Sequence, residues 1–549
     1  MNKTKKLIFS LVITLVIAAI AFYITLPPLN IQSTDFWSFL TFIIIAFGVV
    51  NAILSIDVKR YLGGNAKVSI KGNRFAWGIV IAAIVPVTVI IVGTLTSSAF
   101  FNARAYAGII SVEEAVFEED MPETNTVTNI ALMDSTSAIT IGNRTLGALS
   151  NVVSQYEVAP KYTQINYTGS PKKVANLEYV GFFKWLGNRS VGVPGFVMVD
   201  PVNISAEYVE LSKPMKYVDS AYFNEDLYRA LRFKHPTKIF YNFSFEIDEA
   251  GNPYYIVACA KPRVGLFGAL DINEVIIFDP CTGESEIFNI ENSPSWIDTV
   301  YTGQLASEKY DWHGLYSKGY LNSIIGNKDC KVTTDDFGYI IIGDDVWYFT
   351  GVTSITSDES NIGFIISNAR TGEYKFYPII GAEEYSAMRS AEGEVQEKRY
   401  TASFPSLINI SGEATYIMVL KDDAGIVRLY ALVNVEQYTI VATGETQESA
   451  KRAYVERLKQ EGILDDTLLD DPELPKVMNK EILVSDIKMP VVSGDTVVYI
   501  TDEEGTVYKE KLSNNESLIL LKVGDKLEIY YADTDIEEIK QIFSFKVIS

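Results

Sequence analysis

Three apolar runs open the chain and limit what it can fold into more than any other feature. They span residues 7–26, 36–56 and 75–98, and none contains a charged residue. Roughly 20 apolar residues let a helix cross about 30 Å of hydrocarbon. Pro86 in the third run is compatible with this, because proline is tolerated in membrane helices. We therefore expect residues 1–98 to form a three-helix transmembrane region.

The placement of Lys and Arg predicts the orientation of these helices. Three lysines precede the first run, and the loop 57–74 carries five basic residues against one acid. Basic loops stay in the cytoplasm, so we expect a multi-pass protein of the cell membrane with a cytoplasmic N-terminus. Residues after about 99 are then extracytoplasmic. The alternative is a signal peptide cleaved after the small residues 19–21, although residues 22–26 extend the run to spanning length.

The remainder of the chain is strongly acidic. The whole chain has a net charge of −22, and residues 99–549 hold 39 basic and 67 acidic residues, a net charge of −28. Phosphate binding needs basic surfaces, so this balance predicts no nucleic-acid partner. It is compatible with a basic protein partner. Three Cys and two His exclude a disulfide framework and a local His-based zinc motif, and free thiols are expected. The composition, rich in Ile, Lys, Asn and acids, is typical of a bacterial protein.

Beyond the membrane region the pattern is α+β, with hairpins as its commonest element. β-branched runs meet turns of Asp or Asn with Gly, and a second alternating run follows. We expect a first extracytoplasmic region at 99–235 and repeated hairpin-hairpin-helix modules at 236–469. The repeats would lie at 239–320, 337–395 and 400–461; the alternative is a series of unrelated hairpins. An acidic, proline-containing linker precedes a small all-β domain at 476–549, of the OB or SH3 barrel kind.

Two of the turns carry a family resemblance. Residues 279–284 read DPCTGE and residues 368–373 read NARTGE, each between two strand-like runs. Such hairpins joined to an amphipathic helix resemble PepSY modules, which are small α+β domains of peptidase propeptides and bacterial envelope proteins. The third repeat departs from the pattern, because residues 422–425 read DDAG. The resemblance implies a non-catalytic binding or inhibitory module of the cell envelope.

Recognisable catalytic, cofactor and metal motifs are absent from the sequence. Residues 142–147 begin like a phosphate loop, but Ala148 stands where lysine is required. Two other sets could form a binding surface. One is aromatic at helical spacing, either a core face or a stacking platform for sugars or a partner. The other consists of paired carboxylates around a strand, either solvated turn charges or cation ligands. The members of the two sets are Trp312, Tyr316, Tyr320, Asp335, Asp336, Asp344 and Asp345.

The sequence favours a non-catalytic, membrane-anchored protein that binds, scaffolds or regulates another component of the bacterial cell envelope. Two alternatives stay open. The first is a cell-envelope hydrolase with carboxylate-based chemistry. The second is an accessory subunit of a transport or secretion complex, which would present small residues of its first membrane helix to partner helices. The candidates on that helix are Ser10, Thr14, Ala18 and Ala21.

Overall fold

The structure is a computed structural model, and it divides the chain into two compact units, Met1–Gln460 and Glu461–Ser549. The described residues are 3–55, 74–124, 130, 132–133, 135–355, 357–464, 477–492, 495–512, 516–532 and 539–548. Most of the basic loop 57–74 and the acidic linker at 470–475 lie outside them. The predicted domain limits within residues 99–469 stay predictions.

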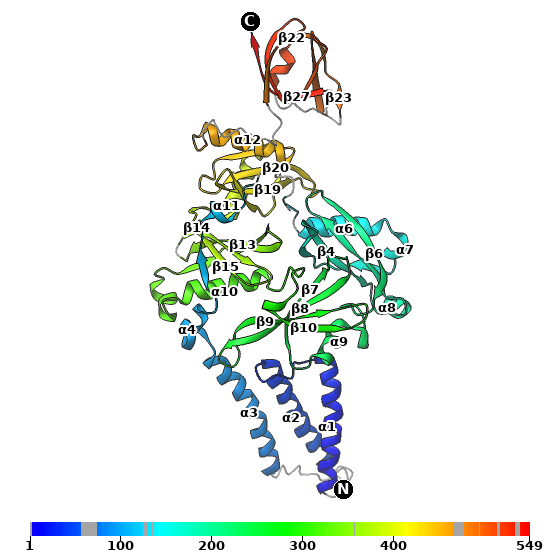
Figure 1. The fold of residues 1–549 in the computed structure, drawn as a ribbon. Coiled ribbons are helices and arrows are strands. Elements are labelled where there is room, and N and C mark those ends of the chain that lie inside the picture. The colour runs from blue at the N-terminus through cyan, green and yellow to red at the C-terminus, as the bar shows by residue number, and fades with distance from the viewer. Residues whose placement is uncertain are drawn as a thin grey trace, which may run out of the picture. The chain divides into compact units, whose positions relative to one another are not determined.

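Three long apolar helices begin the first unit, as the sequence predicts (Figure 1). They are α1 (Lys3–Thr25), α2 (Thr34–Ser55) and α3 (Arg74–Thr96). The segments Thr4–Thr25, Thr34–Leu54 and Trp77–Thr96 are long and apolar enough to cross a membrane. Close contacts join the helices: Asn51 of α2 donates a hydrogen bond to the Ser10 hydroxyl of α1 at 3.2 Å. The three predicted N-terminal helices of spanning length and apolar composition are thus confirmed, whereas their orientation stays a prediction.

The rest of the first unit is mixed α+β, built around four sheets that we name A to D; their strand pairs are antiparallel except for the parallel pair of β1 (Val112–Glu114) with β15 (Tyr374–Tyr377) in sheet C. Sheet A holds β2 (Tyr156–Val158), β3 (Thr163–Tyr167), β4 (Ser170–Tyr179), β5 (Val193–Asp200) and β6 (Ser205–Met215). Sheet B holds β7 (Ile239–Ile247), β8 (Pro253–Val264), β9 (Gly268–Phe278) and β10 (Ser285–Asn289).

Sheets C and D repeat the same up-and-down strand order, with the first strand split in two. Sheet C holds β11 (Lys331–Thr333), β12 (Gly338–Ile342), β13 (Asp345–Ser354), β14 (Ser357–Asn368) and β15 (Tyr374–Tyr377), with β1 (Val112–Glu114) and β16 (Gly381–Ala382) added. Sheet D holds β17 (Thr401–Ala402), β18 (Ser406–Ile410), β19 (Glu413–Lys421), β20 (Val427–Asn434) and β21 (Val441–Gly444).

Helices precede, follow or interrupt the sheets, and some of them contribute to the cores on both sides. They are α4 (Ala99–Ala107), α5 (Phe117–Asp120), α6 (Ser135–Gly147), α7 (Ser150–Val153), α8 (Phe182–Asn188), α9 (Leu227–Lys234), α10 (Gly303–Tyr316), α11 (Glu384–Glu394) and α12 (Gln447–Gln460). Ala387 and Ala391 of α11, for example, share one core with Phe349 of sheet C and Tyr416 of sheet D. Small residues on this helix face let the two sheets approach it closely.

The turn after the third strand fixes each helix to the sheet that follows it in sequence. In sheet C, the side-chain oxygen of Asn368 accepts the N–H groups of Arg370 at 2.9 Å and Thr371 at 2.8 Å. The carbonyl of Ala369 then accepts the N–H groups of Val300 and Tyr301, the residues that lead into α10. Gly372 has φ +72° and closes the turn against the Tyr301 ring.

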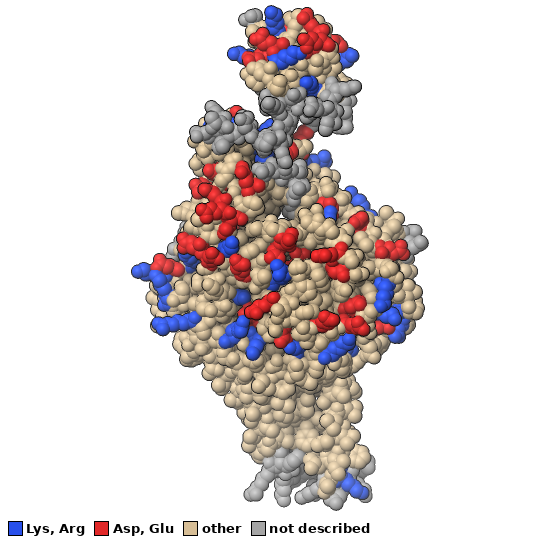
Figure 2. All heavy atoms as spheres, in the orientation of Figure 1, with Lys and Arg blue, Asp and Glu red and all other residues tan. Residues whose placement is uncertain are grey.

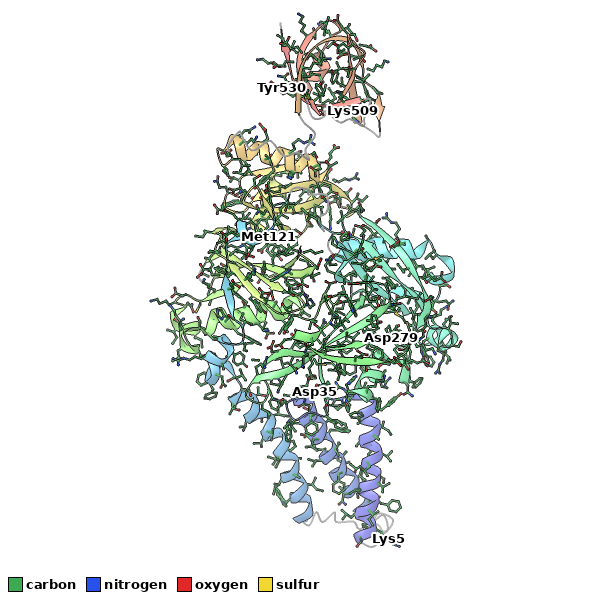
Figure 3. The ribbon with its side chains drawn as sticks, viewed as in Figure 1. Lys5, Asp35, Met121, Asp279, Lys509 and Tyr530 are labelled. Atoms are coloured by element: carbon green, nitrogen blue, oxygen red, sulfur yellow. The ribbon has the colours of Figure 1, made fainter. Side chains whose placement is uncertain are left out.

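Sheet B repeats this arrangement. Asp279, which Figure 3 labels, lies in the turn after β9, and its carboxylate accepts the N–H groups of Cys281 and Thr282. The carbonyl of Pro280 accepts the N–H groups of Lys216 and Tyr217, which lead toward α9. In sheet D the carbonyl of Val435 likewise accepts the N–H of Ala382, just before α11. The backbone hydrogen bonds therefore define a helix-first unit, in which a helix precedes its own sheet.

Sheet A has the same element order, since α6 precedes its strands and Asp200 forms the same kind of turn after β5. The Asp200 carboxylate accepts the N–H groups of Val202 and Asn203, both at 2.9 Å. Leu132 and Met133 lie shortly before α6, as Val300 and Tyr301 lie shortly before α10, and both are buried. Four helix-first units thus follow one another where the sequence pattern predicts three repeats.

The second unit is a small β-barrel. Its strands are β22 (Val477–Lys488), β23 (Val491–Val492), β24 (Asp495–Asp502), β25 (Val507–Lys511), β26 (Lys526–Ala532) and β27 (Ile539–Ile548), with a short 3-10 helix at Glu516–Leu520. Pairings run in a ring through β22, β26, β27, β25 and β24, and only the β25–β27 pair is parallel. Val498, Ile500 and Leu527 are among the buried residues of its core.

Candidate functional site

A cavity of about 340 Å³ lies where sheets A, C and D meet. The β3–β4 hairpin and the β5–β6 turn of sheet A line it, together with β12 of sheet C and β18 of sheet D. Met121, Pro122, Thr124 and Ile130 complete the lining, and Figure 3 labels Met121. Its size falls within the range of ligand pockets, about 300–1,000 Å³.

Strands β3, β12 and β18 are all edge strands of their sheets, and all three reach the cavity. Edge strands present backbone N–H and C=O groups to whatever lies beside them. On β18 the carbonyl of Asn409 accepts the N–H of Thr124 at 2.8 Å, so a segment of the chain itself already uses part of this edge. The cavity wall therefore offers backbone groups as well as side chains to a ligand.

Gln164 on β3 supplies a buried polar group in the cavity wall. Its side chain is 5% exposed, and the Nε2 atom has no hydrogen-bond partner among the described residues. A buried donor without a partner costs about 1–3 kcal/mol. A ligand that offers an acceptor to this amide would remove that cost.

An ion pair stands at the rim of the same cavity. Lys172 Nζ lies 2.7 Å from Asp200 Oδ2. Burial works against ionisation of Asp200, but hydrogen bonds from Lys172 and from Asn203 outweigh it and lower its pKa to about 2. Asp200 is therefore ionised at neutral pH and cannot serve there as a general acid.

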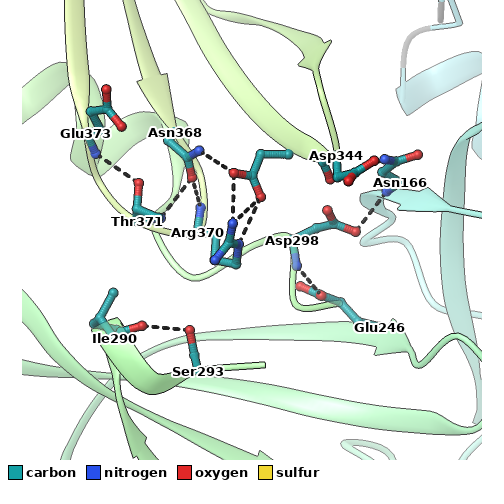
Figure 4. Close-up of polar contacts among 11 residues, drawn as sticks. Asn166, Glu246, Ile290, Ser293, Asp298, Asp344, Asn368, Arg370, Thr371 and Glu373 are labelled. Carbon is teal, nitrogen blue, oxygen red and sulfur yellow. Dashed lines mark hydrogen bonds and ion pairs between the residues drawn. The ribbon is translucent and has the colours of Figure 1, made fainter. Parts of the chain in front are cut away.

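A second polar cluster lies at the junction of sheets A, B and C (Figure 4). Glu246 on β7 is fully buried, and its two oxygens accept the N–H groups of Asp298 and Thr299, both at 2.9 Å. Asp298 accepts the N–H of Asn166 from β3 at 2.8 Å. Burial, with the neighbouring carboxylate, raises the pKa of Glu246. Burial also raises the pKa of Asp298 to about 7.

Asp345 belongs to the same junction. The guanidinium of Arg370 binds it through two nitrogens, the shortest distance being 2.6 Å from Nη2 to Oδ1. Asn368 donates a further hydrogen bond to Asp345 at 2.9 Å. The junction thus connects the turn of sheet C to sheets A and B, and backbone N–H groups already occupy the oxygens of its buried acids. We interpret it as a structural cluster.

The aromatic set predicted from the sequence packs against α4. The Trp312 ring lies 5.2 Å from that of Tyr106, and the Tyr320 ring lies 5.2 Å from that of Phe100. Tyr316 contacts the Tyr106 ring as well. The helix α10 ends at Tyr316, so Tyr320 lies beyond it. Helix α4 therefore covers much of this aromatic face.

The carboxylate set is divided between the two ends of β12. Asp335 is exposed at one end, and Asp336 accepts the N–H of Phe337 at 2.8 Å. At the other end Asp344 is exposed, while Asp345 joins the junction described above. Among the residues that the structure describes, no group of three or more His, Cys, Asp or Glu could hold a metal ion. The structure leaves Cys259, Cys281 and Cys330 buried and unpaired.

Comparison with known proteins adds little to this geometry. No family model matches the chain, and no curated protein matches it. One solved structure that matches is a murine DNA-binding protein bound to double-stranded DNA. It is 13% identical, and the match covers 39% of this chain and 92% of that chain with a TM-score of 0.11. A likeness at that TM-score carries no argument about fold or ligand.

The match nevertheless corrects one prediction. Net charge led us to exclude nucleic acid as a partner. That exclusion is withdrawn, because one matching structure is described as a DNA-binding protein bound to DNA, and the match itself assigns no ligand to this chain. The physical reason is that net charge is a sum over the whole chain. It does not describe the local surface that a ligand meets.

Proposed function

We propose that this is a membrane-anchored, non-catalytic binding protein whose ligand occupies the cavity between sheets A, C and D. The observation that carries the proposal is the buried amide of Gln164, which lines the cavity and whose Nε2 atom has no partner among the residues that the structure describes. Buried polar groups are nearly always hydrogen-bonded, so an unpartnered donor in a cavity wall marks a place for a ligand acceptor. The apolar side chains of β12 and β18 would contribute the remaining contact area.

Binding fits the described cavity better than hydrolysis does. Carboxylate-based hydrolysis requires two acids on either side of the scissile bond, one of them protonated. Asp200 is the only Asp or Glu among the lining residues that the structure describes, and Lys172 keeps it ionised. The acids with raised pKa, Glu246 and Asp298, accept backbone hydrogen bonds at the junction instead.

An accessory-subunit role has one supporting observation. A groove of about 450 Å³ runs between α2 and α3, lined by apolar residues around Gly48 and Ile79. A partner helix would fit such a groove because small residues permit close approach. The face of α1 proposed from sequence is less suitable, since Ser10 and Thr14 are buried and Ser10 already bonds to Asn51.

We further propose that the sheets lie outside the cell. The support is the excess of Lys and Arg in the loop 57–74. Protease added to intact protoplasts should degrade the chain beyond residue 110. Full protection of that region would contradict the orientation and would leave the cavity accessible only from the cytoplasm.

Site-specific photo-crosslinking of the full chain in its native membrane tests the cavity proposal. A photoreactive amino acid replaces Val202 or Tyr339, which line the cavity, or Ser205, an exposed neighbour outside the lining. Binding predicts a discrete adduct from positions 202 and 339 and a weaker or absent adduct from position 205. Equal labelling at all three positions, or no adduct from the cavity, would contradict the proposal.

A further inference from the structure

The β8–β9 hairpin lies against the last turn of α3. The Ser97 hydroxyl accepts the N–H groups of Leu266 at 2.8 Å and Phe267 at 3.2 Å. A Cβ atom on Gly93 would lie 2.5 Å from the Phe267 ring, so a larger residue would force this ring to shift. Gly93 precedes the end of the apolar segment Trp77–Thr96 by three residues, which is about 4–5 Å along a helix. The hairpin tip is therefore level with the apolar part of α3.

Helix α9 makes an equivalent contact with α1. The Phe233 ring lies 5.8 Å from the ring of Phe22 and 6.2 Å from that of Tyr23. The guanidinium of Arg229 lies over the Tyr23 ring at 4.4 Å and donates to the Tyr23 carbonyl. Phe22 also precedes the end of its apolar segment, at Thr25, by three residues. Phe233 is nevertheless 54% exposed, so α1 covers only part of it.

Further exposed apolar and basic side chains lie near the C-terminal end of α3, on α4 and on β8. Phe100 and Phe101, in the first turn of α4, are 57% and 63% exposed. Arg104, Lys261 and Arg263 are exposed on the same elements, α4 and the arm of β8 next to the hairpin tip. Figure 2 shows Lys and Arg side chains on the part of the body that adjoins the membrane helices. Exposed aromatics rimmed by basic residues are typical of a membrane interface.

We propose that the body of the first unit binds directly to the leaflet reached by the C-terminal ends of α1 and α3. Leu266, Phe267 and Phe233 insert at the boundary between acyl chains and headgroups. Arg104 and Lys261 meet anionic lipid headgroups, which attract basic side chains held near a membrane surface. The bilayer is the partner of this surface, because the surface is part of the same chain as the membrane helices and lies at their ends. The body is consequently held at a fixed height above the membrane.

The test places a fluorophore at the proposed depth in the full-length protein, reconstituted in lipid nanodiscs. The fluorophore is attached to Phe267→Cys or Phe233→Cys, with Tyr438→Cys, an exposed turn residue of sheet D, as the matched control. The three native cysteines are buried, and the unsubstituted chain measures their background labelling. Lipids that carry a nitroxide near the headgroup should quench the probes at 267 and 233 but not at 438. A water-soluble quencher that reaches all three equally would overturn the proposal.

A second arm tests the headgroup chemistry without disturbing the apolar contact. The double substitution Arg104→Gln and Lys261→Gln should lower the enrichment of phosphatidylglycerol around the protein in native-lipid nanodiscs. The substitution Lys488→Gln in the second unit should leave it unchanged. Equal enrichment in all three proteins would contradict the role of the basic residues, whatever the quenching shows.

Discussion

Replacing Asn368 with Ala should loosen the attachment of α10 to its own sheet. Two hydrogen bonds from Arg370 and Thr371 to the Asn368 side chain hold the turn that presents the Ala369 carbonyl to Val300 and Tyr301. At about 1 kcal/mol for each bond, their loss weakens the turn by about 2 kcal/mol. Since 1.4 kcal/mol corresponds to a factor of ten, local opening should become about 30-fold more frequent.

Hydrogen exchange of the full-length protein measures this opening directly. Peptides that contain Val300 and Tyr301 should exchange about 30-fold faster in Asn368→Ala than in the unsubstituted protein. Asp422→Ala is the matched control, because it removes two turn bonds of the same kind, from Ala424 and Ile426, in sheet D. Unchanged exchange at residues 300–301, or the same acceleration in both variants, would refute the proposed coupling between turn and helix.

Three further outcomes follow from burial and charge. The pKa of Asp298 is raised to about 7 in the folded protein, whereas in the unfolded chain this carboxyl loses its proton near pH 4. The free energy of unfolding should therefore fall by about 2–3 kcal/mol between pH 5 and pH 8. Denaturation of Asp298→Asn at both pH values should show a smaller fall. Lys309→Met should cost about 3 kcal/mol, because Lys309 pairs with a buried aspartate at 2.6 Å. Arg263→Met, which removes the half-exposed partner of the same acid, should cost less than about 1 kcal/mol in the same unfolding assay. Gly314→Ala should destabilise the fold by about 1–3 kcal/mol in thermal melts, because the new Cβ atom would lie 2.2 Å from the backbone oxygen of Lys331. Gly187→Ala, which has open space around the new Cβ atom, should leave the stability unchanged or raise it.

The membrane helices were predictable because their signal is local. An uninterrupted apolar run of spanning length has few other structures available to it, and α1, α2 and α3 fall within a few residues of the predicted runs. The hairpin turns are similarly local, because Asp279 and Asn368 fold the backbone around their own side chains. Sequence patterns of this kind report the structure of a few consecutive residues.

The grouping of helices with sheets was not predictable in the same way. Element order is identical whether a helix belongs to the sheet before it or after it. The decision rests on the hydrogen bonds from residues 300 and 301 to the Ala369 carbonyl, some 70 residues away in sequence.

The candidate site was missed for a related reason. Gln164 lies in a short alternating strand, where a polar residue usually faces solvent. Its burial depends on sheets C and D, which follow much later in the chain. Glu246 is a similar case, because both faces of β7 are covered although its sequence alternates like that of a half-exposed strand. A sequence signal for either residue would need long-range contacts.

The most direct measurement of the central claim is the affinity of the crosslinked ligand, once identified, for matched variants of the full-length protein. Gln164→Leu removes the unpartnered amide, and Ser170→Trp places a large ring at the cavity wall. Loss of one buried hydrogen bond is worth about 1–3 kcal/mol, so the Kd of Gln164→Leu should rise about five- to 150-fold. The ring of Ser170→Trp should weaken binding further, whereas Ser205→Trp, outside the lining, should bind like the unsubstituted protein. Equal affinity for all four proteins would contradict the account.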